Sequence, residues 1–240
     1  MAKILIISGG SKGIGEGIIE AYLSEGFQVY SISRTKNEGF KAITQIEFDL
    51  SKTDGLAALL TGVFKNFKST EVEKITLINN AGTLGQIGKI EDISDIEKTV
   101  QLNTVTPLIL TSTFISLTKN WACEKKIINI SSGAAQKPYH GWSIYCATKA
   151  AIDMMTKTVA IEQSSIENGV KIIAIYPGVV DTEMQAKIRK SDKESFANID
   201  RFLELKATNS LANATTVGKH IFAIDQDKNI ENGALIRVEE

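Results

Sequence analysis

The sequence predicts an α/β fold in which one doubly wound parallel sheet of about seven strands carries helices on both faces. Two observations support this prediction. Short, β-rich apolar runs alternate with longer amphipathic segments along the 240 residues of the chain. The apolar runs are nearly continuous, which is typical of parallel strands buried on both faces. We expect a single domain over residues 1–240, because no linker-like tract, low-complexity segment or internal repeat divides the chain.

The expected elements follow one another in a regular order. Strands are expected at residues 3–8, 28–33, 44–48, 74–79, 125–131, 170–176 and 234–238. Helices are expected between them, at residues 14–25, 53–67, 96–118, 143–168 and 215–225. Crossovers between parallel strands are right-handed, so this order closes as a doubly wound sheet. Residues 179–211 are charged and show no clear strand, so we expect a substrate lid there; a surface insertion with a short helix is the alternative.

Composition and charge argue against several classes of function. The formal net charge is −1, so the chain has no basic nucleic-acid footprint. Cys123 and Cys146 lack the spacing of a metal site or a disulfide framework, and His140 and His220 are the two histidines, so no metal site is expected. The first residues run directly into a strand, and no apolar run reaches the ~20 residues of a membrane span. We therefore expect a cytoplasmic protein that binds neither nucleic acid nor membrane.

A glycine-rich loop joins the first expected strand to the first helix. Residues 8–15 read Ser-Gly-Gly-Ser-Lys-Gly-Ile-Gly. Glycines allow a tight turn and a close approach of the backbone to a pyrophosphate, and the helix N-terminus offers unpaired N–H groups. The spacing differs from the common dinucleotide fingerprint, yet the strand–loop–helix setting favours a dinucleotide site over a generic glycine-rich turn. The residues expected to bind the cofactor here are Ser8, Gly9, Ser11, Lys12, Gly13, Ile14 and Gly15.

The end of the second expected strand indicates which dinucleotide is bound. Folds that select NAD usually place an acidic residue here to hold the ribose 2′-hydroxyl. This chain has Ser33 and Arg34 instead, with Lys12 available from the glycine loop. A guanidinium can hold a 2′-phosphate through charge-assisted hydrogen bonds, so NADP(H) is expected; the alternative is that Arg34 is a solvated turn residue. Asp49 and Leu50 are expected to bind the cofactor, Asp49 through the adenine amino group, with capping of the next helix by Asp49 an equal alternative.

Tyr145 and Lys149 form a candidate catalytic pair. They lie four residues apart in a segment of helical composition, so both side chains project from one helix face. A phenol titrates near pH ~10 in water, and a nearby ammonium favours the phenolate and moves the pKa toward neutrality. This spacing is common by chance, so its weight depends on the motifs that accompany it.

Three further motifs accompany this pair in a fixed order. Residues 79–82, Asn-Asn-Ala-Gly, end the fourth expected strand, Ser132 ends the fifth, and residues 177–182 follow the sixth. With the glycine loop and with Tyr145 and Lys149, these motifs stand in the order and spacing of the short-chain dehydrogenase/reductase superfamily. The resemblance covers essentially the whole chain and implies a nicotinamide-dependent oxidoreductase.

The resemblance also implies a role for each of four residues. Tyr145 is implied to be the proton donor in reduction, or the acceptor in oxidation, and Lys149 to hold the nicotinamide ribose and lower the pKa of Tyr145. Ser132 is implied to hydrogen-bond the substrate oxygen, and Asn103 to anchor a water-linked proton relay through a distorted helix. Further cofactor contacts are implied at Asn80, Ala81, Gly82, Tyr145, Lys149, Pro177, Gly178, Val180 and Thr182.

A narrower resemblance concerns the substrate. Residues 77–85, 136–149 and 177–185 are similar to the sepiapterin reductases, and the benzil reductases and related NADPH-dependent carbonyl reductases share much of this pattern. Sepiapterin reductases carry a C-terminal aspartate that anchors the pterin, whereas this chain has Arg237 near that place. An arginine side chain cannot accept a hydrogen bond. The departure favours a broader ketone or diketone reductase.

Substrate contacts are expected at Ser132, Trp142, Gly178 and Met184. Tyr139 and Phe202 are suited to join Trp142 and Met184 in an apolar pocket for a flat or aromatic substrate; a place in the core or in an interface is the alternative for each. Two other functions stay open: a dehydrogenase of a sugar, acyl or steroid alcohol, and a non-catalytic dinucleotide-sensing protein. The resemblance also implies a homodimer or homotetramer formed through helices 96–118 and 143–168.

Overall fold

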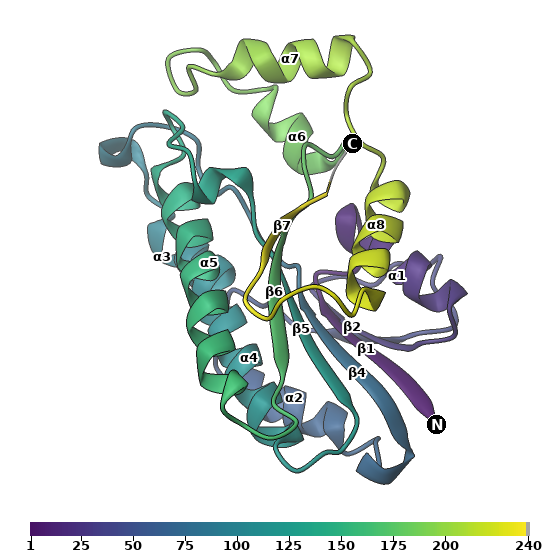
Figure 1. Ribbon diagram of the computed structural model, residues 1–240. Helices are drawn as coiled ribbons and strands as arrows, with labels where there is room; N and C mark the ends of the chain where they lie inside the picture. The colour runs from purple at the N-terminus through teal and green to yellow at the C-terminus, as the bar shows by residue number, and fades with distance from the viewer. Residues whose placement is uncertain (239–240) are drawn as a thin grey trace.

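The computed structural model describes residues 1–238 and contains a seven-stranded parallel sheet in the order β3-β2-β1-β4-β5-β6-β7 (Figure 1). The strands are β1 Ala2–Ser8, β2 Gln28–Ser33, β3 Thr44–Glu47, β4 Val72–Asn79, β5 Glu124–Ile130, β6 Lys171–Tyr176 and β7 Leu235–Arg237. The strand order reverses between β1 and β4, which is where a doubly wound sheet opens a ligand-binding crevice. The predicted fold class is confirmed.

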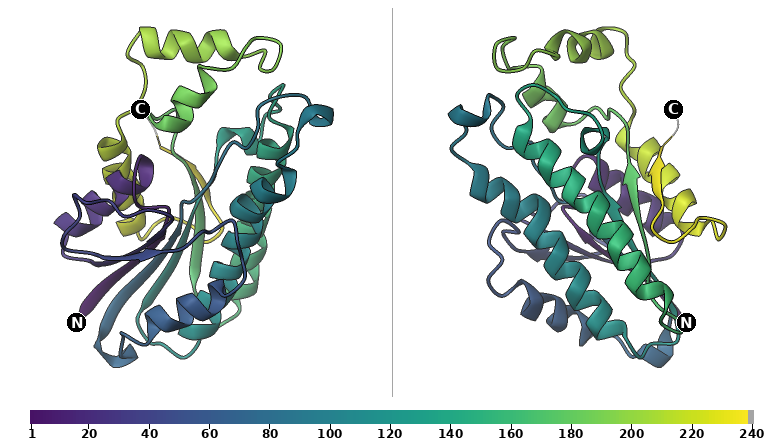
Figure 2. Two further views of the ribbon diagram at one scale, coloured as in Figure 1. Left: turned by 180° about the vertical axis from the view of Figure 1, so that it is seen from behind. Right: turned by 60° about the vertical axis from the view of Figure 1, so that its left-hand side comes forward.

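Helices cover both faces of this sheet. They are α1 Ile14–Ser24, α2 Leu56–Phe64, α3 Ile96–Val100, α4 Thr106–Thr118, α5 Ser143–Ser164, α6 Glu183–Ile188, α7 Ile199–Ala207 and α8 Ala214–Gln226. Helices α1 and α8 pack against each other on one face, while α2, α4 and α5 cover the other (Figure 1 and Figure 2). The arrangement has three layers, with the sheet in the middle.

Strand β1 shows why the apolar strands are nearly continuous. Ile4 and Ile6 are fully buried in the core cluster that contains the apolar residues of α2 and α4. Leu5 and Ile7 are fully buried in the cluster that contains those of α1 and α8. Successive side chains of a strand point to opposite faces, so a strand covered on both sides needs an apolar residue at every position.

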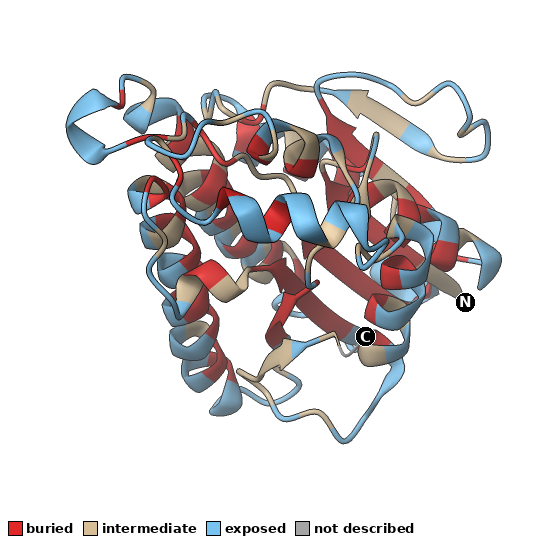
Figure 3. Cartoon of the chain, turned by 90° about the horizontal axis from the view of Figure 1, so that it is seen from above, coloured by how far each residue is buried: buried red, intermediate tan, exposed pale blue. Residues whose placement is uncertain are grey.

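The carboxyl ends of the strands lie beneath exposed helices and loops, as the view from above shows (Figure 3). Helices α6 and α7 lie over this edge (Figure 1). Both fall within residues 179–211, a range in which the sequence indicated at most a short helix. With six and nine residues they are too short to produce a strong helical period. That this segment acts as a lid stays a prediction.

The predicted boundaries of the other elements are right to within a few residues. The largest differences concern two helices: the one expected at 53–67 is Leu56–Phe64, and the one expected at 143–168 ends at Ser164. Asn168 has a positive φ of 53° and is followed by Gly169, so the chain turns there instead of continuing the helix.

The helical stretch Ile96–Thr118 is continuous but irregular. It consists of α3, a π-helical turn at Gln101–Val105, and α4, so the distorted helix implied at this place is confirmed. By length and composition alone this stretch could cross a membrane, contrary to the expectation that no run would be long and apolar enough. One such helix is weak support for a membrane span, because core helices pass the same test. Leu110 and Phe114 of this stretch are fully buried in the core.

Candidate active site

The loop after β1 brings the backbones of two strand ends into contact. Gly9 has a φ of +72°, and a Cβ atom at this position would lie 2.8 Å from the Cα of Ala81, so only glycine fits. Helix α1 begins at Ile14 without a side-chain cap from any of residues 1–238, which leaves its first N–H groups for another acceptor. The loop and the helix N-terminus form a backbone cradle that fits the pyrophosphate of a dinucleotide.

Ser8 has a structural role in this loop, and the cofactor contact expected of it stays a prediction. The residue is buried, and its Oγ accepts hydrogen bonds from the N–H groups of Asn80 and Ala81, each at 3.1 Å. Asn80 in turn donates through Nδ2 to the carbonyl oxygen of Gly9 at 2.8 Å. Ser8 therefore ties the end of β1 to the segment that follows β4, and its side chain is occupied by that task.

The two basic residues expected at the 2′-phosphate are in different situations. Arg34 is exposed at the end of β2, lines the cavity described below and forms no ion pair with any residue between 1 and 238. Lys12 of the glycine loop is ion-paired with Glu183 at the start of α6. Arg34 is thus available to an anion, whereas Lys12 bridges the glycine loop to the segment above the sheet edge.

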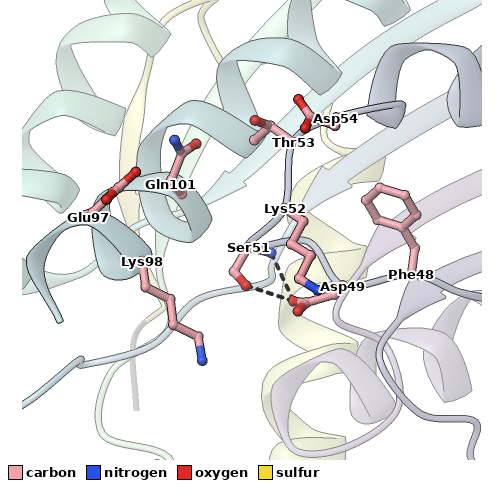
Figure 4. Close-up of a pocket in the computed structure, with 9 residues that line it drawn as sticks. All are labelled: Phe48, Asp49, Ser51, Lys52, Thr53, Asp54, Glu97, Lys98 and Gln101. Atoms are coloured by element: carbon pink, nitrogen blue, oxygen red, sulfur yellow. Dashed lines mark hydrogen bonds between the residues drawn. The ribbon is translucent and has the colours of Figure 1, made fainter.

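Asp49 does not cap helix α2, so that alternative is wrong. Its carboxylate accepts hydrogen bonds from the N–H and the Oγ of Ser51, at 3.1 and 2.8 Å, and α2 begins only at Leu56 (Figure 4). These hydrogen bonds lower the pKa of Asp49. A pocket of about 550 Å³ lies between this turn and the side chains of Glu97 and Lys98. The adenine contact of Asp49 stays a prediction.

Tyr145 and Lys149 lie one turn apart on α5, and both residues are buried. The Nζ of Lys149 lies 5.8 Å from the centroid of the Tyr145 ring and donates a hydrogen bond to the carbonyl oxygen of Ile130 at 2.7 Å. Burial lowers the pKa of Lys149 to about 8, and the carboxylate of Asp153 acts in the opposite direction. Lys149 is therefore an ammonium at neutral pH and loses its charge in mildly alkaline solution.

The pKa of Tyr145 differs from what the resemblance implied. It is raised, because burial disfavours the phenolate, while the neighbouring Ser132 hydroxyl acts in the opposite direction. Burial outweighs the lowering by Ser132, and Lys149 is not among the groups of residues 1–238 that shift this pKa. The phenol therefore stays protonated at neutral pH, which is the state needed to give a proton away.

Ser132 and Asn103 complete the group of four candidate catalytic residues. Ser132 is the second residue after β5, and its Oγ accepts a hydrogen bond from the N–H of Ala134 at 3.2 Å. Asn103 lies in the π-helical turn, where its side chain exchanges two hydrogen bonds with the backbone of Thr83, at 2.7 and 2.8 Å. Its Nδ2 also donates to the Oγ1 of Thr148 at 3.2 Å. Asn103 is thus buried and links α5 to the segment after β4.

One cavity of about 1170 Å³ joins the glycine loop to Tyr145. All of the residues predicted from the sequence to bind cofactor or substrate, or to take part in catalysis, line this cavity except Ser8 and Asn103. The structure therefore brings together side chains and backbone from the ends of β1, β2, β3, β4, β5 and β6 and from helix α5. Their arrangement on one cavity is what a reaction between a dinucleotide and a second small molecule requires.

The end of the cavity near Tyr145 is aromatic. Trp142 stacks on Phe196 with ring centroids 4.6 Å apart and planes 9° apart. Tyr139 lies 5.0 Å and Phe202 lies 5.6 Å from Trp142, measured between ring centroids. Trp142 and Phe202 belong to a small core cluster and also line the cavity, as do Tyr139 and Met184. The core and pocket interpretations of these residues therefore both hold.

Charged side chains connect α6 with α7, and one of them reaches Tyr139 on the cavity wall. Asp181 pairs with Lys206 at 2.6 Å and with Arg189 at 3.6 Å. Arg201 of α7 donates a hydrogen bond to the hydroxyl of Tyr139 at 3.3 Å. Exposed ion pairs of this kind contribute little to stability, about 0–1 kcal/mol each.

Sequence reasoning missed two residues around the catalytic pair, Asp153 and Phe196. Asp153 accepts hydrogen bonds from Ser131 at 2.5 Å and from Tyr176. The sequence pattern could have revealed Asp153, because an acidic residue stands there one turn after Lys149, on a helix face that is otherwise buried. Phe196, in the charged segment before α7, gave no signal that separates it from an ordinary core residue.

Arg237 is the last residue of β7, and its place near a bound substrate stays a prediction. It lines the cavity, donates a hydrogen bond to the Oε1 of Gln136 at 3.1 Å and lies over the ring of Tyr176, 5.5 Å from its centroid. A guanidinium at this place offers donors to a ligand and no acceptor.

Comparisons with known proteins agree with this geometry. A family model described as short chain dehydrogenase matches residues 3–193. The chain is 40% identical over 248 residues to a benzil reductase ((S)-benzoin forming) from Bacillus cereus, covering 99% of this chain and 100% of that protein. It is 27% identical over 252 residues to the sepiapterin reductase of Rattus norvegicus, covering 96% of this chain and 94% of that protein.

Two solved structures share the fold. A short-chain dehydrogenase/reductase from Saccharomyces cerevisiae matches with a TM-score of 0.85 at 23% identity, over 100% of this chain and 97% of that chain. ElxO, solved with NADP bound, matches with a TM-score of 0.80 at 24% identity, over 99% of this chain and 97% of that chain. At this level of identity the likeness shows the doubly wound fold alone.

Proposed function

The chain belongs to the short-chain dehydrogenase family, as its ordered motifs indicated, and we propose that it is an NADPH-dependent reductase of a ketone or diketone carbonyl. The observation that carries the proposal is the shared cavity, on which Tyr145, Lys149 and Ser132 meet the glycine loop. A proton donor, a cation and a hydroxyl beside a dinucleotide cradle are the groups that carbonyl reduction needs.

The chain's own residues would act on the carbonyl oxygen. When bound, the reduced nicotinamide supplies a hydride to the carbonyl carbon. As the oxygen gains negative charge, the hydroxyls of Ser132 and Tyr145 stabilise it by donating hydrogen bonds to it. Tyr145 then gives its proton to that oxygen, and the ammonium of Lys149 stabilises the phenolate that remains. The buried walls around Tyr145 exclude water from this exchange.

The pKa shifts favour reduction at neutral pH. Burial raises the pKa of Tyr145, so the phenol holds its proton and is ready to donate it. Burial lowers the pKa of Lys149 to about 8, so its ammonium is present below that pH and is lost above it. Reduction should therefore be fastest at or below neutral pH and should decline as the pH rises through the pKa of Lys149.

Arg34 supports NADP(H) as the cofactor. Its guanidinium is exposed at the end of β2 and lines the cavity, where the family places the adenosine ribose. An arginine can hold a 2′-phosphate through two parallel hydrogen bonds, whereas an acidic residue at this place would repel it. A related structure, ElxO, binds NADP, which agrees with this choice.

The pocket favours a flat aromatic ketone or diketone. The aromatic walls formed by Trp142 and Phe202 match an aryl carbonyl in shape and polarity. Arg237 offers only donors, which does not suit the amino and ring N–H groups of a pterin. A benzil-like substrate therefore fits the pocket better than sepiapterin does, in line with the relative from Bacillus cereus.

We further propose that the chain forms a homo-oligomer through α4 and α5. Leu108 on α4 is 45% exposed, and Met154 and Ile161 on α5 are 63% and 74% exposed. Large apolar side chains that face solvent along two neighbouring long helices favour an isologous contact between copies.

The proposed function is tested by following NADPH absorbance with a short panel of carbonyl compounds. The panel contains benzil, a methylglyoxal-type diketone, a simple aryl ketone, sepiapterin and a sugar, and each assay is repeated with NADH. We expect turnover of benzil and the aryl ketone with NADPH and much slower turnover with NADH. Turnover of the sugar alone, or of sepiapterin alone, would contradict the substrate assignment; no turnover despite bound NADPH would contradict carbonyl reduction itself.

A further inference from the structure

Asp153 is a buried carboxylate with no part in the chemistry described above. It lies on α5 one turn beyond Lys149 and is 7% exposed. One of its oxygens accepts a hydrogen bond from the Oγ of Ser131 at 2.5 Å, and the other accepts from the hydroxyl of Tyr176. Tyr176 also accepts a hydrogen bond from the Nε2 of Gln136 at 2.9 Å. Both oxygens are therefore held by donors from neighbouring segments.

Hydrogen bonds from hydroxyls do not neutralise this carboxylate. An ionised carboxylate taken out of water is costly unless a cation compensates it. The buried cation on the same face of α5 is Lys149, and the charge of Asp153 raises the pKa of Lys149 against the lowering caused by burial. The carboxylate of Asp153, one turn away on the same helix, therefore favours the ammonium form of Lys149.

The polar and titratable groups around Asp153 belong to the ends of β5, β6 and β7, to the turn after β5 and to α5 itself. Ser131 follows β5, Tyr176 ends β6 and Gln136 follows Ser131 in the next turn. The pKa of Tyr176 is raised, first by burial and then by Asp153, so it stays a neutral donor. Arg237 of β7 lies over the ring of Tyr176, 5.5 Å from its centroid, and acts on the pKa of Tyr176 in the direction opposite to Asp153, while burial raises the pKa of Tyr145 on α5. Within this set, Asp153 supplies the negative charge that faces Lys149.

Ser131 connects this charge to the substrate end of the site. Its Oγ donates to Asp153, and its N–H donates to the carbonyl oxygen of Ile175 at 2.8 Å. The next residue is Ser132, which lines the cavity. The position of Ser132 relative to Tyr145 therefore depends on a hydrogen bond between Asp153 and Ser131 that spans from helix α5 to the end of β5.

We propose that Asp153 is a positioning residue, which ties the Ser131–Ser132 segment to the helix that carries Tyr145 and places a carboxylate one turn from Lys149. The proposal rests on the roles proposed above for Tyr145, Lys149 and Ser132. Asp153 itself touches neither cofactor nor substrate in this scheme, and it acts through its two neighbours.

The test is the pH dependence of Asp153→Asn, which keeps the shape of the side chain and removes its charge. Without the carboxylate, the ammonium of Lys149 is less stable, so it loses its proton at a lower pH. We expect the midpoint of the alkaline loss of NADPH affinity, measured by fluorescence titration without substrate, to move down by about one pH unit. The alkaline limb of kcat for carbonyl reduction should move in the same direction.

Two control variants show whether a shift in Asp153→Asn comes from the lost charge of Asp153 or from a change in the structure around it. Glu162→Gln removes an exposed charge from the same helix and should leave the midpoint where the wild type has it. Tyr176→Phe removes one hydrogen bond to Asp153 but keeps the carboxylate, so it should not lower the midpoint. An Asp153→Asn midpoint equal to that of the wild type, or a wild-type NADPH affinity that does not change across this pH range, would overturn the proposal.

Ser131→Ala carries the test if Asp153→Asn does not fold. It breaks the tie to Asp153 while it keeps both charges, so kcat should fall about tenfold, the cost of one charge-assisted hydrogen bond, while NADPH affinity and its pH midpoint stay unchanged. An unchanged kcat would overturn the positioning role. Failure of the proposed function is distinguishable, because it would appear as a wild type that binds NADPH and reduces no carbonyl in the panel.

Discussion

At the scale of single residues, the proposed preference for NADPH over NADH should depend on Arg34. The sequence predicted two cations for the 2′-phosphate, but Lys12 is ion-paired with Glu183 and would have to leave that partner to meet an anion. If Lys12 left Glu183 for the 2′-phosphate, the binding free energy would change little, because one exposed charged contact would replace another. Arg34 has no such competing partner among residues 1–238, so it should provide most of the discrimination.

Arg34→Ala should weaken NADPH binding and leave NADH binding unchanged. A charge-assisted hydrogen bond contributes about 1.5–3 kcal/mol, so the Kd for NADPH should rise about tenfold to a hundredfold. Fluorescence titration with each cofactor measures the effect. The matched control is Lys36→Ala, an exposed cation that pairs with Glu47 at 3.3 Å outside the cavity. Equal losses of NADPH and NADH affinity in Arg34→Ala would contradict the role of Arg34.

At the scale of elements, helices α1 and α8 are packed at the closest distance that backbones allow. A Cβ atom at Gly218 of α8 would lie 2.1 Å from the carbonyl oxygen of Gly17 in α1. The contact fixes α1, whose N-terminus forms part of the dinucleotide cradle, against the sheet. A glycine in the middle of a helix is otherwise unfavourable, so this position owes its glycine to packing.

Gly218→Ala should destabilise the fold although alanine is the better helix former. Overpacking of this kind costs about 1–3 kcal/mol in the free energy of unfolding, which urea denaturation measures. Gly62→Ala in α2 is the matched control: a Cβ atom there would meet no other described atom within 4 Å, and the change should stabilise by about 0.5–1 kcal/mol. Equal effects of the two substitutions would show that the α1–α8 contact is looser than the structure indicates.

The elements that the sequence predicted well are those with strong local patterns. The apolar strand β1 and the long helix α5 had clear periods, and the glycine loop was placed by its composition. Helices α6 and α7 were missed because they are short and owe their stability to contacts such as that of Phe202 with Trp142. The tasks of Ser8 and Asp153 depend on partners distant in sequence, so no local pattern could reveal them.

At the scale of the whole molecule, a buried charge cluster joins α8 to the central strands. Asp225 of α8 has a fully buried side chain and pairs with Lys74 of β4 at 3.1 Å and with Lys126 of β5 at 3.2 Å. Burial lowers the pKa of Lys126, and Asp225 acts in the opposite direction. The cluster holds helix α8, and through it α1, against the sheet.

Asp225→Asn should destabilise the protein by about 3–5 kcal/mol, because it leaves the buried ammonium of Lys126 without its counter-charge, whereas Lys74 keeps its second partner Glu124 at 3.0 Å. The urea unfolding midpoint of the variant measures this loss. Glu167→Gln, which removes an exposed acid, is the control and should leave the midpoint unchanged. An Asp225→Asn variant as stable as the wild type would show that the lysines find other partners or water.

If one cavity joins a bound NADPH to a carbonyl that Tyr145 protonates, loss of the Tyr145 hydroxyl should stop reduction without loss of NADPH binding. The most direct test compares wild-type protein, Tyr145→Phe and Tyr30→Phe in benzil reduction by NADPH, with NADPH affinity measured separately by fluorescence. Tyr30 packs on Phe67, with ring centroids 5.0 Å apart, away from the cavity, so its variant should turn over like the wild type. Tyr145→Phe should bind NADPH normally and lose about 10²–10⁴-fold in kcat. A Tyr145→Phe variant that binds NADPH and reduces benzil at the wild-type rate would contradict the account.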